Sequence, residues 1–219
     1  LSDWNATERA HPLHVGAMRA FRLHARRTPD RIAIRFGEET VSYAALDRWA
    51  DRIAAALLGR SLPEGARVGL LMRRSPGLVA AMLGALRAGI PHVPLDPAMP
   101  PARRAAIVAD AGIGAMLTLA ADRTLMPEGG PRVIEVDRLD GPARTRFPRV
   151  PADRAAYLIY TSSTTGAPKG VEVLHRGLSN LLFAMARTPG IGRDDRLLAV
   201  TTVTFDIAGL ELLLPLIRG

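Results

Sequence analysis

Cysteine is absent from the 219 residues of this chain, and its absence excludes several kinds of chemistry. Without cysteine there is no disulfide bond, no thiolate metal site and no cysteine nucleophile. No apolar run reaches the roughly 18 residues that a membrane-spanning helix needs, and the polar segment 1–9 has no signal-peptide core. We therefore expect a cytoplasmic protein with no membrane partner.

Aromatic residues are scarce at 5%, and Lys169 is the only lysine although the formal net charge is +8. The positive charge comes from arginines that are scattered along the chain without a dense basic run. Too few aromatic side chains are present for a base-stacking platform, so a nucleic-acid partner is not expected. The scatter is typical of a coding bias toward arginine and alanine, although a positive field would also attract a nucleotide polyanion.

Hydrophobic periodicity alternates between helical and strand spacing along most of the chain. Helices are expected at 13–27, 43–58, 75–88 and 101–111. Ser42 and Ser75 are placed to cap the second and third of these helices, and Gly89 is placed to end the third. Short strands are expected at 32–36, 40–42, 67–72, 92–95, 115–119 and 132–136. This order predicts an α/β fold with a doubly wound, largely parallel sheet and flanking helices.

Residues 137–153 are rich in proline, glycine and arginine, which is typical of a surface loop or a domain seam. We therefore divide the chain into a linker at 1–12, a first α/β subdomain at 13–150, and the start of a second subdomain at 151–219.

The segment from 155 to 174 carries the most informative pattern. An apolar strand at 155–160 runs into five consecutive hydroxyl residues, Thr161 to Thr165, then Gly166, Pro168 and Lys169, and a second strand at 171–174. Hydroxyl and backbone donors beside one cation suit the oxygens of a triphosphate, and glycine allows a close backbone approach. The strand–loop–strand pattern differs from a Walker A loop, which leads into a helix. A solvated Ser/Thr turn is the alternative interpretation.

Residues 160–170 resemble the phosphate-binding signature of the adenylate-forming superfamily, which includes acyl-CoA synthetases, luciferases and peptide-synthetase adenylation domains. The resemblance implies that ATP phosphates bind Thr161, Ser162, Ser163, Thr164, Thr165, Gly166 and Lys169. Ser163 departs from the pattern, because the family normally has glycine there. If that backbone has a positive φ, serine costs about 1 kcal/mol or more of strain and weakens phosphate binding.

Two other segments resemble motifs of the same superfamily, in the same order. Residues 41–46 resemble its first core motif, and 86–97 resemble its second, in which peptide synthetases usually have tyrosine where this chain has His92. Residues 4–8 resemble the linker that joins a condensation domain to a following adenylation domain.

Residues 202–213 resemble the fourth core motif of the superfamily. From the residues alone, Asp206 opens a helix with an apolar face of Ile207, Leu210, Leu214 and Ile217, and an aspartate there offsets the helix dipole. The resemblance implies that Asp206 pairs with the α-ammonium group of an amino-acid substrate, and that Phe205 packs near the substrate carboxylate and the nucleotide. Phe205 is alternatively an ordinary core residue. Glu211 is expected on the helix surface or in packing, and His175 is expected to cap or pack.

The resemblance implies the incomplete N-terminal portion of the adenylate-forming enzyme fold, here of a nonribosomal peptide synthetase adenylation domain. Such a domain uses ATP and Mg²⁺ to form aminoacyl-AMP and then loads the phosphopantetheine thiol of a carrier domain. The expected partners are that carrier domain, an upstream condensation domain and the missing C-terminal part of the adenylation domain.

The catalytic lysine of the family is expected beyond Gly219. We therefore assign no catalytic residue and no protein metal ligand, and we expect the fragment to be inactive alone, with exposed apolar surface near 210–217 that favours self-association. An acyl- or aryl-acid AMP ligase and a non-catalytic remnant or interaction module are the alternatives, and the sequence does not name the amino acid.

Overall fold

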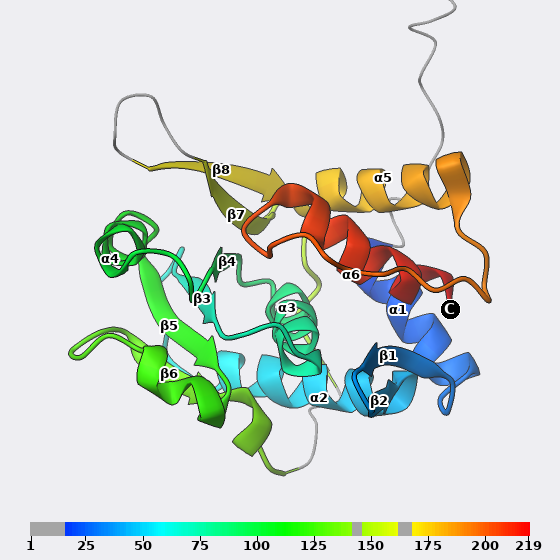
Figure 1. Cartoon of the computed structure of the whole chain (residues 1–219), viewed down its shortest axis with the longest axis horizontal. Helices are drawn as coiled ribbons and strands as arrows, with labels where there is room; N and C mark the ends of the chain where they lie inside the picture. The colour runs from blue at the N-terminus through cyan, green and yellow to red at the C-terminus, as the bar shows by residue number, and fades with distance from the viewer. Residues whose placement is uncertain (1–15, 142–145, 162–167) are drawn as a thin grey trace, which may run out of the picture.

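The computed structural model describes residues 16–141, 146–161 and 168–219, and its centre is a six-stranded sheet with the order β6-β5-β3-β4-β7-β8 (Figure 1). Every pairing in this sheet is parallel except that of β7 with β8. The strands are β3 (Arg67–Leu71), β4 (His92–Leu95), β5 (Ile113–Thr118), β6 (Arg132–Glu135), β7 (Ala155–Thr161) and β8 (Lys169–Leu174). A separate antiparallel pair is formed by β1 (Ile32–Phe36) and β2 (Glu39–Ser42).

Helices cover both faces of the sheet, so the predicted α/β fold with a largely parallel sheet is confirmed. The helices are α1 (Gly16–Arg27), α2 (Tyr43–Leu58), α3 (Pro76–Ala88), α4 (Pro101–Asp110), α5 (His175–Met185) and α6 (Asp206–Arg218). Short helical turns lie at Ala120–Leu125, Val136–Arg138 and Ala186–Gly190.

Two hydrophobic cores form because neighbouring strand residues point to opposite faces of the sheet. In β3, Leu70 belongs to the larger core with α1, α2, α3, α5 and α6, whereas Leu71 belongs to the smaller core beneath α4. In β7, Tyr157 and Leu158 divide in the same way. The strands are therefore buried on both faces, as their continuous apolar sequences indicate.

The capping residues expected from the sequence take their places in the fold. The Ser42 side chain accepts a hydrogen bond from the Ala45 amide at 3.2 Å, and Ser75 accepts one from the Leu78 amide at 3.3 Å. Gly89 ends α3 at a φ of 68°, in the left-handed region that favours glycine. These local signals fix the ends of the two helices that pack most extensively on each other, α2 and α3.

The structure differs from the expected elements in several places, including β5, which spans Ile113–Thr118 where 115–119 was expected. Helix α5, which begins at His175, was not expected from the sequence. The sequence analysis expected only that His175 caps or packs after a strand. Strand β8 begins at Lys169, two residues earlier than expected, because the antiparallel ladder continues to the Thr161–Lys169 pair.

The expected apolar surface near 210–217 is a further correction. Leu213, Leu214, Leu216 and Ile217 are buried, because α6 packs against α1 and α5. The exposed large hydrophobic side chains lie earlier in this region, at Leu197, Leu198, Val200, Phe205 and Ile207. Periodicity found an apolar side of α6 but could not show that the distant helix α1 would cover it.

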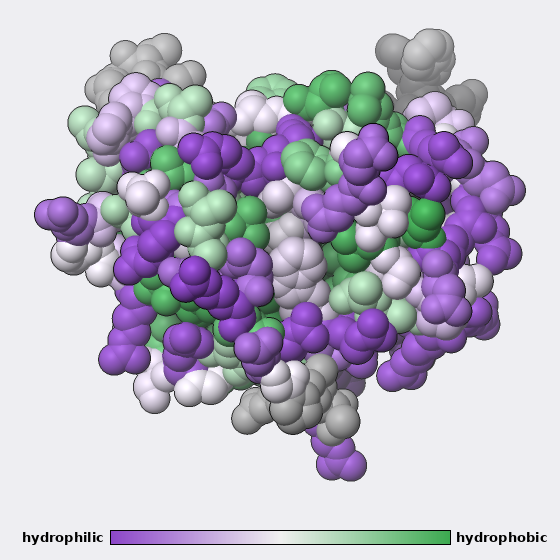
Figure 2. All heavy atoms as spheres, turned by 60° about the horizontal axis from the view of Figure 1, so that its bottom comes forward, coloured by the Kyte–Doolittle hydropathy of each residue, from purple (hydrophilic) through white to green (hydrophobic). Residues whose placement is uncertain are grey.

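The division of the chain near residue 150 remains a prediction. Strands β7 and β8 extend the same sheet that β3 to β6 build, so both parts of the chain contribute to one sheet. No helix in the described ranges is both long and apolar enough to cross a membrane. On the face that Figure 2 shows, hydrophilic and hydrophobic side chains are intermingled.

Two histidines are held neutral where β4 and β7 meet the helices. His92 is only 2% exposed, and its ring lies 5.6 Å from that of Tyr157. Burial, with a smaller effect from nearby His175, lowers the pKa of His92 to about 3. Burial and then Arg154 lower the pKa of His175 to about 4. Protonation of either histidine is therefore strongly disfavoured in the folded protein.

We predict that acid destabilises this fold, because the folded state lowers the pKa of both histidines. Below the unfolded pKa of about 6.5 the unfolded chain binds protons that the folded chain does not, so the free energy of unfolding falls as pH falls. Each histidine contributes a slope that approaches about 1.4 kcal/mol per pH unit down to its folded pKa. Urea unfolding of the wild type and His92→Tyr between pH 7.5 and 4.5 tests this. In the variant the free energy of unfolding should fall less steeply with pH, by up to about 1.4 kcal/mol per pH unit, because one titrating histidine is gone. Equal slopes in the two proteins would contradict the prediction.

Candidate functional site

The hydroxyl-rich loop connects the two strands of a hairpin at the sheet edge. Thr161 and Lys169 are cross-strand partners at the open end of β7 and β8, and both are exposed. Of the predicted phosphate-binding residues, Ser162, Ser163, Thr164, Thr165 and Gly166 lie outside the described residues. The strand–loop–strand pattern agrees with the sequence interpretation, and it differs from the strand-to-helix turn of a Walker A loop.

Tyr160 anchors this hairpin to the neighbouring helix. Its hydroxyl donates a hydrogen bond of 2.6 Å to an Asp110 carboxylate oxygen at the end of α4. Burial and this carboxylate raise the pKa of Tyr160 to about 12. The ring lies against Gly170, where an added Cβ would be 3.0 Å from the tyrosine Cζ, so a side chain here would require the ring to shift. The anchor fixes where the loop leaves the sheet.

Phe205 and Asp206 stand at the N-terminus of α6. Asp206 is the first residue of the helix and is exposed, and its Oδ1 accepts a hydrogen bond of 2.9 Å from the Ile207 amide. Phe205 is 54% exposed, so it is not a core residue. A carboxylate in the first turn offsets the helix dipole and can still reach a ligand cation.

A narrow crevice joins the start of α6 to the sheet. Its volume is only about 10 Å³, roughly the room of one water molecule, so the described residues do not enclose an amino acid. Burial raises the pKa of the Tyr157 hydroxyl, and the negative charge of Asp206 raises it further. The lining residues come from α3, β4, β7 and the start of α6: Met82, His92, Pro94, Tyr157, Ile159, Val203, Phe205, Asp206, Gly209 and Leu213.

Strand β7 links the predicted phosphate loop to the predicted amine ligand, because it carries both Thr161 and the Tyr157 side chain that lines one crevice with Asp206. Tyr157, which faces Asp206, and Thr161, which opens the loop, are four residues apart on β7. A strand rises about 3.3 Å per residue, which separates the two positions by about 13 Å. The tertiary structure thus brings together two features that lie about forty residues apart in the sequence.

The segment before Asp206, residues 199–204, is held by three charged side chains that the sequence analysis did not assign to the site. Glu211 of α6 accepts hydrogen bonds from the Val200 and Thr201 amides, both at 3.0 Å, and from the Thr201 hydroxyl at 2.7 Å. Burial alone would raise the pKa of Glu211, but these hydrogen bonds and Arg74 lower it overall. The sequence analysis expected Glu211 on the helix surface or in packing, and the structure adds that its carboxylate binds this segment directly.

Arg74 and Asp96 hold the same segment from the sheet. Arg74 follows β3 and donates to the Ala199 carbonyl at 3.0 Å and to the Thr201 carbonyl. Asp96 follows β4 and accepts a 3.0 Å hydrogen bond from the Thr202 hydroxyl. The segment therefore crosses the carboxyl ends of two parallel strands, the edge at which open α/β sheets bind ligands. The position of Asp96 at the end of the second motif was the sequence signal available for this contact.

No group of three or more histidine, aspartate or glutamate residues that could hold a metal occurs in the described part of the chain. The exposed Lys169 and Thr161 at the mouth of the hairpin fit the phosphates of a nucleotide by charge and hydrogen-bonding capacity. A Mg²⁺ ion would then be bound chiefly by those phosphates, as is usual for nucleotide-associated magnesium.

Comparison with known proteins agrees with this arrangement. The profile of the AMP-binding enzyme family matches residues 21–219. A dimodular nonribosomal peptide synthase of Bacillus subtilis strain 168 is 38% identical over 228 residues, which cover 100% of this chain and 10% of that protein. The chondramide synthase cmdD of Chondromyces crocatus is 36% identical over 227 residues, which cover 100% of this chain and 6% of that protein. The chain thus spans about a tenth or less of these relatives.

Solved structures give the same result. The nonribosomal peptide synthetase FmoA3, in its AMPPNP-bound form, superimposes with a TM-score of 0.88 at 34% identity, covering 98% of this chain and 23% of that chain. The N-terminal subdomain of Klebsiella oxytoca NpsA, in complex with 3-hydroxyanthranilyl-AMSN, superimposes with a TM-score of 0.81 at 25% identity, covering 93% of this chain and 51% of that chain. The chain therefore belongs to the AMP-binding enzyme family, and it forms the N-terminal portion of the adenylation-domain fold of nonribosomal peptide synthetases.

Proposed function

We propose that this chain is the N-terminal part of an adenylation domain that activates an α-amino acid with ATP. The hairpin loop from Thr161 to Lys169 would bind the phosphates, and Asp206 would bind the α-ammonium group. The observation that carries the proposal is that Asp206 lines the same crevice as Tyr157 of β7, the strand whose last residue, Thr161, opens the loop.

The proposed reaction is an adenylyl transfer. An oxygen of the substrate carboxylate forms a bond to the α-phosphorus of ATP, and the bond from that phosphorus to pyrophosphate breaks. In the second step the thiol of a carrier phosphopantetheine forms a thioester with the acyl carbon, and AMP leaves. The residues of this chain would orient the reactants and compensate charge: Lys169 would offset the charge of the leaving pyrophosphate, and Phe205 would pack beside the reacting carboxylate.

Asp206 is the reason to favour an amino acid over an aryl or fatty acid. A carboxylate at the substrate site stabilises an ammonium group but repels a second acid. The NpsA subdomain has been solved with 3-hydroxybenzoyl-AMSN, an aryl compound, whereas FmoA3 has been solved with α-methyl-L-serine-AMP. An aryl- or acyl-acid ligase is therefore the main alternative enzyme. A cytoplasmic multidomain synthetase with condensation and carrier partners is the setting we infer.

We expect the 219-residue chain to bind Mg-ATP but not to catalyse ATP–pyrophosphate exchange. If the backbone at residue 163 has a positive φ, Ser163→Gly should tighten ATP binding about fivefold, which corresponds to about 1 kcal/mol of strain removed. Lys169→Met should weaken binding, because it removes the cation. Isothermal titration of each protein measures these changes. Binding by none of the three proteins would favour a non-catalytic remnant, and measurable exchange by the chain alone would contradict its predicted inactivity.

Asp206→Asn is the test of the substrate class, in a polypeptide that carries the remaining part of the domain. Loss of a charge-assisted hydrogen bond of about 1.5–3 kcal/mol should raise the KM for the amino acid about 10- to 100-fold. The KM for ATP should stay unchanged. Asp30→Asn, at an exposed aspartate that does not line the crevice, is the matched control. An unchanged KM for every amino acid in the Asp206 variant would favour the aryl- or acyl-acid alternative.

Glu211 is expected to position Asp206 by holding the segment before it. Glu211→Ala removes three hydrogen bonds, so the Val200 and Thr201 amides should exchange with solvent about 10- to 100-fold faster, consistent with about 1.5–3 kcal/mol. Amide exchange followed by NMR measures this. Glu128→Ala, at an exposed glutamate, is the control, and equal exchange in both variants would show that the segment does not depend on Glu211.

A further inference from the structure

The hairpin of β7 and β8 joins the rest of the sheet at a single backbone pair. In the described part of the chain, β4 pairs with β7 only where His92 faces Tyr157. The two strands of the hairpin, by contrast, pair with each other as far as Thr161 and Lys169. Residues 158–161 therefore extend past β4 toward α4 (Figure 1). Because backbone pairing with β4 does not fix the direction of this open end, side-chain contacts have to fix it.

The end of α4 is tied to both strands of the hairpin. On β7, the Tyr160 hydroxyl donates a hydrogen bond of 2.6 Å to Asp110, the last residue of α4. On β8, Glu172 lies 3.5 Å from the guanidinium of Arg67, and this same guanidinium donates to the Ala111 carbonyl at 3.0 Å. The direction of the hairpin is thus set by α4 and the residue that follows it, rather than by the neighbouring strand alone.

Asp110 stands at a position where its charge does not help its own helix. A carboxylate in the last turn lies at the negative end of the helix dipole, which costs about 0.3–1 kcal/mol. Helix α4 has no basic residue in this turn that could compensate. The carboxylate is instead compensated by the Tyr160 hydroxyl, which at its raised pKa of about 12 stays a proton donor at neutral pH. An acid that disfavours its helix and binds the hairpin indicates a role in the hairpin.

We propose that Asp110 is a positioning residue for the nucleotide: through Tyr160 it fixes the end of the hairpin at which Thr161 and Lys169 meet the phosphates. The phosphate contact rests on the proposed function, whereas the tie between α4 and the hairpin does not. Without the tie, the hairpin can turn about its single pair with β4, and the Lys169 ammonium is held less well at the phosphates. Asp110 itself does not touch the nucleotide.

The kinetic test uses a polypeptide that carries the remaining part of the domain. Asp110→Ala and Tyr160→Phe should each raise the KM for ATP about fivefold, the order expected when one hydrogen bond no longer holds the site. The KM for the amino acid should stay unchanged, because Asp206 is held by other contacts. The double variant should be no worse than either single variant, since both act through one bond. Asp110→Asn keeps an acceptor oxygen and should restore most of the wild-type KM.

The position of the hairpin is measured without any nucleotide. Because the chain has no cysteine, Ala106→Cys on α4 and Val171→Cys on β8, both at exposed positions, place two spin labels at chosen sites. Pulsed electron paramagnetic resonance then gives the distribution of distances between α4 and the hairpin. This distribution should be narrow in the otherwise unaltered chain and should broaden when Asp110→Ala or Tyr160→Phe is added.

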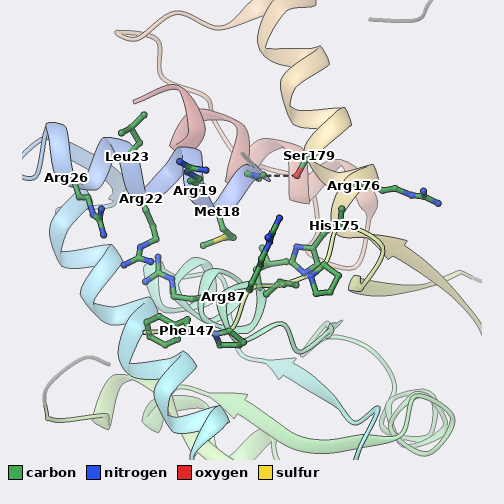
Figure 3. A pocket seen from close by; sticks show the side chains of 18 residues that line it. Met18, Arg19, Arg22, Leu23, Arg26, Arg87, Phe147, His175, Arg176 and Ser179 are labelled. Atoms are coloured by element: carbon green, nitrogen blue, oxygen red, sulfur yellow. Dashed lines mark hydrogen bonds between the residues drawn. The ribbon is translucent and has the colours of Figure 1, made fainter. Parts of the chain in front are cut away.

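Asp153→Ala is the matched control, at the base of the same hairpin. Asp153 is an exposed aspartate that pairs at 3.0 Å with Arg176, a residue on the wall of a cavity of about 1010 Å³ (Figure 3). This variant should change neither the distance distribution nor the KM for ATP.

Four results would overturn the inference. They are an unchanged distance distribution in Asp110→Ala, a broadened distribution with an unchanged KM for ATP, an equal rise of KM for both substrates, and a double variant much worse than either single variant. In each of these cases the wild-type domain still uses ATP, so the proposed function stands. A complete wild-type domain that uses no ATP would instead refute the proposed function and, with it, the role of Asp110 toward the nucleotide.

Discussion

The parallel pairing of β4 with β7 is the contact on which the proposed site depends. It brings His92 opposite Tyr157 and joins the first part of the chain to the hairpin that carries the hydroxyl-rich loop. Because the strands are parallel, their carboxyl ends lie at one edge of the sheet. Asp96, which follows β4, and Thr161, the last residue of β7, therefore both lie at that edge. A change of register by one residue would turn every side chain of β7 to the other face and bury Leu158 beneath α6 in place of Tyr157.

Asp206 owes its position to contacts that come from three directions. Arg74 and Asp96 reach residues 199–202 from the ends of β3 and β4, and Glu211 reaches them from α6 itself. Hydrogen bonds that involve an ionised group are roughly twice as strong as neutral ones, so this short segment is held firmly although its side chains at Leu198 and Val200 are largely exposed. A substrate-binding carboxylate is held in a better defined position when its supporting loop is fixed in this way.

The arginines explain why a chain of net charge +8 need not be a nucleic-acid binder. Several of them donate hydrogen bonds to backbone carbonyls of other segments: Arg154 to Gly89 at 2.6 Å, Arg218 to Ile191 at 3.1 Å, and Arg104 to Met99 at 2.8 Å. The planar guanidinium supplies several donors in a fixed geometry, which suits this role better than the lysine ammonium. These arginines are thus part of the internal framework of the fold.

Most of the elements, two helix caps and the strand–loop–strand pattern follow from the amino-acid sequence, because periodicity and the residues Ser42, Ser75 and Gly89 act over a few residues. It also marked Lys169 and Asp206 as chemically unusual. Three outcomes became visible only in the folded chain: α1 covers α6, Glu211 binds backbone amides, and Arg74 and Asp96 contact one segment. Those outcomes depend on which distant strands pair and which helices pack, and local spacing carries no information about partners a hundred or more residues away.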